Sequence, residues 1–149
     1  MDIRLVVFDL DGTLIGAPPK AFSEVKEELR KRLLERGGIS EELIGDLTPM
    51  YETLIEISEK TGIPPFDELH SIQVELETER MKDAFLFKGV RESLEFLRGK
   101  GIRMAVVTRS SRDAALFALQ KTGIADYFDV IVAREDVPPR PVEAKWGGK

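Results

Sequence analysis

The sequence predicts an α/β fold in which a short parallel sheet carries an inserted bundle of helices. Three short apolar runs, at residues 3–8, 102–108 and 128–133, have the continuous pattern of buried parallel strands. Helical periodicity fills the segments between them. Because parallel strands are joined by right-handed crossovers, we expect the three strands to pair in chain order. The sheet would belong to a Rossmann-like three-layer core.

The segment between the first strand and residue 84 is predicted to be helical throughout. Gly37-Gly38 ends the first helix, and Ser40 caps the next segment. Pro49 separates the second helix from the third, because proline inside a helix costs about 3 kcal/mol. Gly62 ends the third helix and Pro64-Pro65 starts the fourth. The four predicted helices lie near residues 19–36, 40–46, 49–61 and 65–82.

Helices and strands alternate after residue 84. A helix over 90–98 precedes the second strand, and a helix over 112–122, capped by Ser110 or Ser111, precedes the third. Prolines 138, 139 and 141 exclude regular structure beyond that strand. The predicted domains are therefore a core of residues 1–16 and 84–149 and an all-α helical cap of residues 17–83. Each is expected to depend on the other for stability.

Composition narrows the class of protein. The net charge is −5 and the sequence contains no basic stripe, which argues against nucleic acid as a partner. No apolar run is long enough to span a membrane. The chain has no cysteine, which excludes disulfides and thiolate metal sites. The start has no signal-peptide pattern, so we expect a cytoplasmic protein. The absence of asparagine, with abundant Lys, Arg and Glu, favours a thermophilic source.

The candidate site is the run Asp9-Leu10-Asp11-Gly12-Thr13, directly after the first strand. Side chains at i and i+2 of a strand point to the same face, so the two carboxylates project together. They lie at the carboxyl end of the strand, where ligands bind in parallel sheets. One aspartate can attack phosphorus while the other handles the proton, and both can present oxygen to Mg²⁺.

These residues resemble the haloacid dehalogenase-like hydrolases, particularly the phosphoglycolate phosphatase-like branch with a helical cap. The first motif of that family, DxDGT, is matched by Asp9 to Thr13. The second, a Thr or Ser at the end of the next core strand, is matched by Thr108. The resemblance covers nearly the whole chain, and the predicted cap lies between the two motifs as in the family.

The resemblance implies a role for each matched residue. Asp9 would be the nucleophile that forms an aspartyl-phosphate, and Asp11 the general acid and then the base. Thr108 would hydrogen-bond the phosphoryl group. The Asp9 carboxylate and the Asp11 backbone carbonyl would bind Mg²⁺, the implied cofactor. The residues expected to bind substrate are Gly12, Thr13, Arg109 and Arg140 (or Lys145).

The chain departs from the family pattern in its third and fourth motifs. The third is a lysine, where this sequence has Arg140 before a proline, with Lys145 as a rival. The fourth, a pair of acidic residues after a further strand, has no counterpart before Lys149. Glu135 and Asp136 could supply a substitute metal carboxylate, although an ordinary loop role is favoured. The site would therefore bind Mg²⁺ weakly.

Two functions are compatible with this pattern. The first is a weak Mg²⁺-dependent phosphatase that hydrolyses a small phosphorylated metabolite through an aspartyl-phosphate. The second is a catalytically degraded relative with a binding or regulatory role.

The missing fourth-motif strand also predicts an assembly. In the family fold that strand pairs with the nucleophile strand, so Ile3–Phe8 is expected to lie at an open sheet edge. The segment contains no proline or lysine to discourage pairing. We expect a homodimer through this edge. A separate chain or the protein's own tail are the alternative covers.

Overall fold

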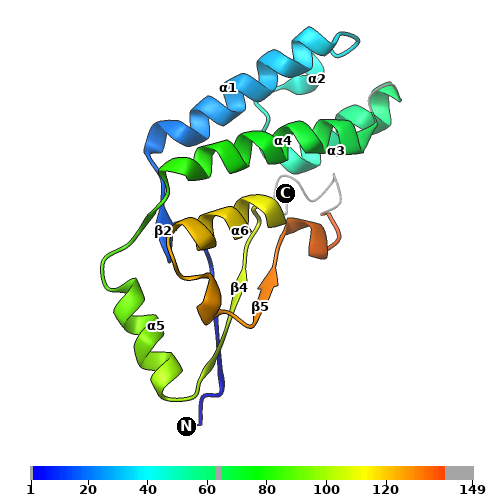
Figure 1. Cartoon of the computed structure of the whole chain (residues 1–149). Helices are drawn as coiled ribbons and strands as arrows, with labels where there is room; N and C mark the ends of the chain where they lie inside the picture. The colour runs from blue at the N-terminus through cyan, green and yellow to red at the C-terminus, as the bar shows by residue number, and fades with distance from the viewer. Residues whose placement is uncertain (1, 63–64, 140–149) are drawn as a thin grey trace. The chain divides into compact units, whose positions relative to one another are not determined.

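A computed structural model of the chain describes residues 2–62 and 65–139 (Figure 1). The chain divides into two compact units, the first containing residues 1–18 and 77–137 and the second containing Pro19–Leu76. The sequence-based boundaries, after residues 16 and 83, differ from these. The end of the fourth inserted helix belongs to the first unit, because contacts described below attach it to the core.

The first unit is built on a parallel sheet. It consists of β1 (Leu5–Phe8), β4 (Arg103–Val107) and β5 (Val130–Val132) in the order β1-β4-β5 (Figure 1). Val6 lies beside Met104, and Val106 lies beside Ile131. The three predicted strands and their order are confirmed.

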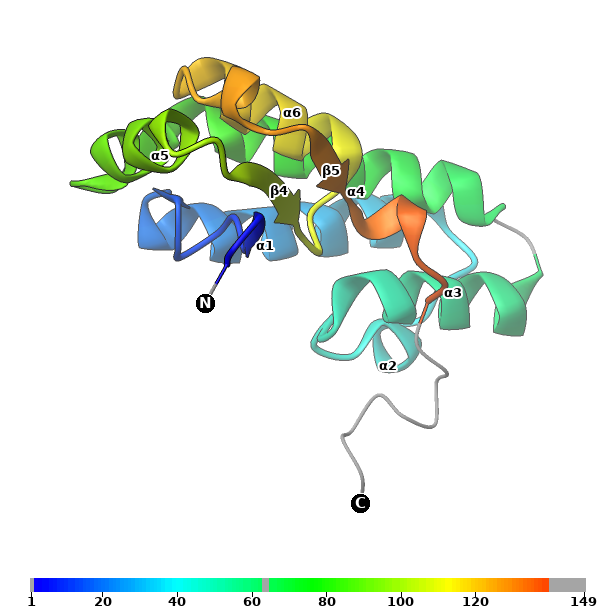
Figure 2. The same ribbon diagram turned by 90° about the horizontal axis from the view of Figure 1, so that it is seen from below.

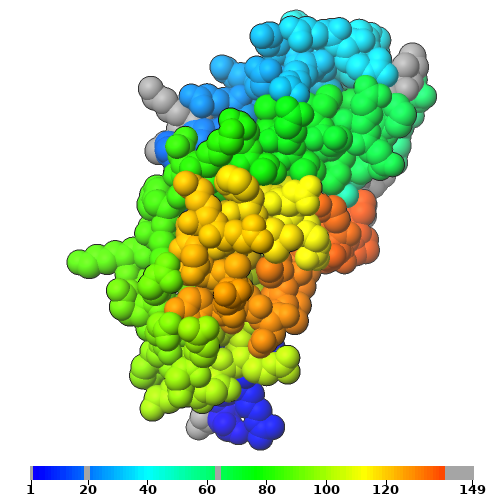
Figure 3. All heavy atoms as spheres, in the orientation of Figure 1, coloured from blue at the N-terminus to red at the C-terminus, as the bar shows by residue number. Residues whose placement is uncertain are grey.

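Helices α5 (Val90–Gly99) and α6 (Arg112–Lys121) bury one face of this sheet. Its core is continuous from the strands through the first loop to both helices, and includes Leu10, Leu94, Met104, Val106, Ala118 and Leu119. In the space-filling view, the atoms of α6 and the segment after it hide the strands behind them (Figure 3). The opposite face is different: Leu5, Val7, Val107 and Val130 are each about half exposed.

A two-stranded antiparallel ribbon within the first unit joins the segment just before the inserted helices to the segment after them. It pairs β2 (Ile15–Gly16) with β3 (Phe85–Leu86) and was not predicted. Strands of two residues are too short to show a periodic pattern. The Phe85 ring packs over Gly16, where a Cβ would come within 2.6 Å of the tip of the ring.

The second unit is helical, as predicted. It contains α1 (Pro19–Arg36), α2 (Glu41–Ile44), α3 (Met50–Thr61) and the first part of α4 (Phe66–Arg80). The short α2 contacts both α1 and α3, and lies beside α3 in Figure 2. Ser40 caps α2 by accepting a hydrogen bond from the Leu43 amide at 3.1 Å, and Gly62 ends α3 in the left-handed conformation. The buried core includes Leu29, Leu33, Leu54, Ile57 and Leu69. None of the described helices is long and apolar enough to cross a membrane.

Candidate functional site

The candidate site lies at the carboxyl ends of β1 and β4. Phe8 is in register with Val106, so Asp9 and Thr108 follow directly on neighbouring strands. Thr108 is buried and its amide donates to the Val132 carbonyl at 2.9 Å, which extends the ladder by one residue. The Asp9 carboxylate accepts a hydrogen bond from the Leu10 amide at 2.8 Å, while the residue as a whole is exposed. The Asp9 carboxylate is therefore accessible and anchored by one backbone hydrogen bond.

The loop after Asp9 is anchored to the core of the first unit by buried side chains. Leu10, Leu14 and Ile15 are almost completely buried, and the Leu10 carbonyl accepts hydrogen bonds from the amides of Thr13, Leu14 and Ile15. Gly12 sits at φ 81°, a conformation that favours glycine, and its amide donates to the Ile15 carbonyl at 2.9 Å. The Gly-Thr pair of the motif therefore shapes the turn that carries Asp11.

The Asp11 carboxylate is held by two side chains from distant parts of the sequence. Arg80 donates through Nη2 to Oδ1 at 3.2 Å, and the Ser110 hydroxyl donates to Oδ2 at 3.0 Å. The Ser110 amide in turn donates to the Thr108 hydroxyl at 3.1 Å. A continuous polar chain therefore joins Asp11 to Thr108, the two residues that the sequence placed at one site from separate motifs.

A second polar cluster supports the loop after β4. The guanidinium of Arg134 donates to both carboxylate oxygens of Glu77, at 2.7 and 2.8 Å, and both side chains are nearly buried. Arg134 also donates through Nη1 to the Arg109 carbonyl at 3.2 Å and through its backbone amide to the Ser110 carbonyl at 3.0 Å. These contacts fix the backbone from which Thr108 and Ser110 project, while the Arg109 side chain remains exposed.

The two candidate caps of α6 have separate roles. Ser111 is the N-cap and accepts a hydrogen bond from the Ala114 amide at 3.2 Å. Ser110 is thereby available to contact Asp11.

The two acidic residues after β5 have structural partners. Glu135 accepts hydrogen bonds from the Arg112 amide at 3.0 and 3.1 Å. Asp136 accepts from the Arg112 guanidinium and, at 2.8 Å, from the Ala133 amide. Both carboxylates therefore hold the start of α6 against the loop after β5, the ordinary loop role that the sequence favoured.

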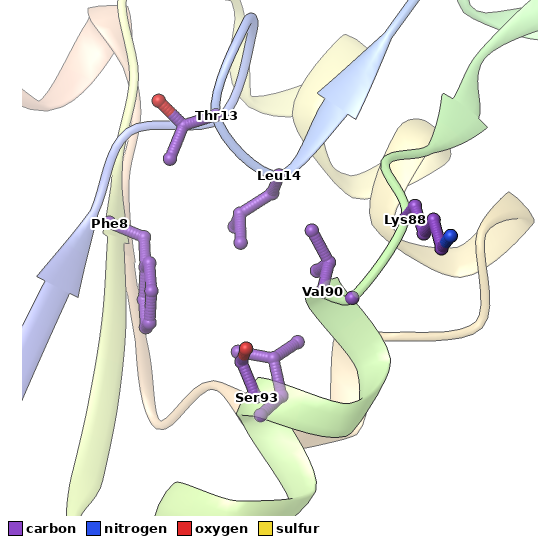
Figure 4. A pocket seen from close by; sticks show the side chains of 8 residues that line it. Phe8, Thr13, Leu14, Lys88, Val90 and Ser93 are labelled. Carbon is purple, nitrogen blue, oxygen red and sulfur yellow. The ribbon is translucent and has the colours of Figure 1, made fainter.

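A pocket of about 280 Å³ lies beside the loop that follows β1 (Figure 4). Phe8 contributes from β1, Thr13 and Leu14 from the loop, and Val90 and Leu94 from α5. Lys88, Gly89 and Ser93 complete its lining. Thr13, a predicted substrate-binding residue, thus borders a pocket that is mostly apolar.

The remaining predicted residues cannot be placed, because Arg140 and Lys145 lie outside the described residues. In the part of the chain that the structure describes, no three acidic or histidine side chains gather as a metal-binding group. Asp9 and the Asp11 carbonyl offer oxygen ligands of the kind that Mg²⁺ prefers, and Mg²⁺ usually combines one or two carboxylates with waters and substrate phosphate. The donor set is compatible with the ion.

Four residues of this region were not anticipated: Glu77, Arg80, Ser110 and Arg134. The partners of Arg80 and Arg134 lie 69 and 57 positions away in the sequence, so no local pattern connects them. Glu77 and Arg80 are three residues apart on α4, a spacing that places them on adjacent parts of the helix surface. This spacing of two opposite charges near the end of α4 was the one sequence signal that could have pointed to them.

Comparison with known proteins identifies the family. Residues 6–143 match the haloacid dehalogenase-like hydrolases. The chain belongs to this family. A phosphoglycolate phosphatase of Rhodobacter capsulatus is 29% identical over 139 residues, covering 91% of this chain and 64% of the relative. A phosphorylated carbohydrates phosphatase of Thermotoga maritima is 32% identical over 149 residues, covering 91% and 63%.

The fold is shared with solved structures of the family. CbbY from Rhodobacter sphaeroides, in complex with phosphate, superposes with a TM-score of 0.60 at 20% identity, covering 93% of this chain and 67% of CbbY. At that identity the similarity concerns the fold alone. The chain spans slightly less than two thirds of the two curated relatives named above.

Proposed function

We propose that this haloacid dehalogenase-like protein is a phosphatase that hydrolyses a small phosphomonoester through Asp9 and Asp11. The observation that carries the proposal is the polar chain from Asp11 through Ser110 to Thr108, beside an accessible Asp9. The two curated relatives, both named as phosphatases of phosphorylated metabolites, support the substrate class.

The reaction has two steps, each with a role for Asp9 and Asp11. In the first, the Asp9 carboxylate attacks phosphorus, the phosphorus–oxygen bond to the leaving group breaks, and Asp11 donates a proton to the departing oxygen. In the second, Asp11 takes a proton from water, which attacks the aspartyl-phosphate and releases inorganic phosphate. The hydrogen bonds from Arg80 and Ser110 hold the Asp11 side chain in place for both steps.

Thr108 and the metal would stabilise the transferred group. The Thr108 hydroxyl, which accepts a hydrogen bond from the Ser110 amide, would donate to a phosphoryl oxygen. Mg²⁺, held by Asp9 and the Asp11 carbonyl, would supply positive charge against the negative charge that develops on the phosphoryl oxygens.

Hydrolysis of p-nitrophenyl phosphate in the presence of Mg²⁺ tests the proposal. Asp9→Asn is expected to lose turnover completely, because an amide is a poor nucleophile. Asp11→Asn is expected to lose about 10²- to 10⁴-fold, the range for removing a general acid–base group. Asp2→Asn is the matched control, since Asp2 precedes the same strand but is exposed at its other end.

Turnover that survives undiminished in purified Asp9→Asn would refute the mechanism. If the unaltered protein binds beryllofluoride at Asp9 without turning over any phosphomonoester, the binding or regulatory alternative replaces the enzymatic one.

A further inference from the structure

Two unlike groups hold the two oxygens of the Asp11 carboxylate. The Arg80 guanidinium donates to Oδ1 at 3.2 Å, and the Ser110 hydroxyl donates to Oδ2 at 3.0 Å. A guanidinium can only donate, whereas a hydroxyl can rotate and either donate or accept. The two oxygens of Asp11 are therefore not equivalent when the carboxyl group gains or loses a proton.

The surroundings of Asp11 favour one oxygen as the site of protonation. The Arg80 side chain carries a permanent positive charge and is 17% exposed, so solvent screens that charge little. Its hydrogen bond stabilises negative charge on Oδ1. The proton that Asp11 binds therefore goes to Oδ2, the oxygen that faces the Ser110 hydroxyl.

The backbone that carries Ser110 is fixed, so its hydroxyl is the part that can turn. The Ser110 carbonyl accepts from the Arg134 amide at 3.0 Å, and the Ser110 amide donates to the Thr108 hydroxyl at 3.1 Å. Neither bond uses the Ser110 hydroxyl. Ser110 is nearly buried, whereas the Asp11 side chain is about one third exposed. A sheltered hydroxyl thus lies beside a carboxylate that a substrate can reach.

We propose that Ser110 is a positioning residue that directs the proton of Asp11 to and from Oδ2. This inference rests on the proposed phosphatase function. In the first step Oδ2 gives its proton to the leaving oxygen as the phosphorus–oxygen bond breaks, and the Ser110 hydroxyl turns to donate to the carboxylate that forms. In the second step Oδ2 takes a proton from the attacking water, and the hydroxyl turns away so that its oxygen faces the new O–H group.

Two esters of similar shape separate this role from a general loss of activity. Phenyl phosphate releases a basic phenolate that needs a proton, whereas p-nitrophenyl phosphate releases a weakly basic one that departs without it. We compare kcat/KM for the two esters, because kcat/KM covers the step in which the leaving group departs. Both values come from one preparation, so their ratio does not depend on how much of a variant is folded.

The neighbouring serine supplies a matched control. Ser111 is buried and caps α6, where its hydroxyl accepts a hydrogen bond from the Ala114 amide at 3.2 Å. Ser111→Ala removes a buried hydroxyl from the same loop without touching Asp11. It is expected to lower stability and to leave the ratio of the two kcat/KM values unchanged.

The decisive variant is Ser110→Ala, which removes the hydroxyl and keeps the backbone hydrogen bond to Thr108. It is expected to lower kcat/KM for phenyl phosphate about tenfold more than for p-nitrophenyl phosphate, part of the 10²- to 10⁴-fold that a general acid supplies. Ser110→Thr keeps a hydroxyl on the same Cβ, and is expected to return the ratio most of the way to its original value.

The outcomes distinguish this inference from the function on which it rests. If the unaltered protein is active and Ser110→Ala slows both esters equally, the assignment of Ser110 is overturned and the phosphatase stands. An equal change of ratio in Ser111→Ala, or no recovery in Ser110→Thr, would also overturn the assignment. An unaltered protein that hydrolyses neither ester would refute the phosphatase itself, and this inference with it.

Discussion

Replacing Arg134 by methionine is expected to destabilise the protein more than any surface charge substitution. The guanidinium donates two hydrogen bonds to Glu77, at 2.7 and 2.8 Å, with side-chain exposures of 5% and 11%. Methionine keeps most of the volume but leaves the Glu77 carboxylate buried without its counter-ion. Breaking a buried pair from one side costs about 3–5 kcal/mol. We expect a loss in the free energy of unfolding of this size.

Urea unfolding followed by circular dichroism measures this loss. The control is Lys82→Met, which removes an ion pair with Glu79 whose members are 60% and 65% exposed, and is expected to change stability by less than about 1 kcal/mol. The double variant Glu77→Leu with Arg134→Met is expected to recover much of the loss, because no charge remains buried. If Arg134→Met alone fell within about 1 kcal/mol of the unaltered protein, this account of the pair would be wrong.

Two further substitutions test groups linked by hydrogen bonds. Arg80→Met is expected to lower kcat/KM for p-nitrophenyl phosphate by about ten- to hundredfold, because Asp11 loses a partner that positions it, and Arg80→Lys should recover part of the loss; unchanged kinetics in Arg80→Met would contradict this role. Tyr127→Phe tests the hydrogen bond that the Tyr127 hydroxyl donates to Glu95, which lowers the pKa of Glu95 and raises that of Tyr127. The stability advantage of the unaltered protein over Tyr127→Phe should be present at neutral pH. It should be lost as the pH falls below the ordinary Glu95 value of 4.5, and lost again as the pH rises above the ordinary Tyr127 value of 10.0. Urea unfolding at several pH values measures it, and an advantage that does not change with pH would exclude this linkage.

Much of the architecture was predictable because its signals are local. Continuous apolar runs marked all three strands of the sheet, and glycine, proline and serine marked the ends of the inserted helices within about two residues. The motif from Asp9 to Thr13 predicted a candidate phosphate site for the same reason: a strand, two carboxylates and a glycine turn are consecutive in the chain.

Only the tertiary structure selected the partners of those carboxylates. Arg80 and Ser110 meet at Asp11 from positions 69 and 99 residues away, and no sequence pattern connects either of them to Asp11. The pairing of Glu77 with Arg134 depends likewise on where α4 ends relative to the loop after β5 within the first unit. Side-chain contacts of this kind arise from the packing of elements that are distant in sequence, and no spacing rule encodes them. The sequence by itself therefore determined the helices, the strands and the candidate site carboxylates. The packing of those helices and strands determined which side chains hold the carboxylates.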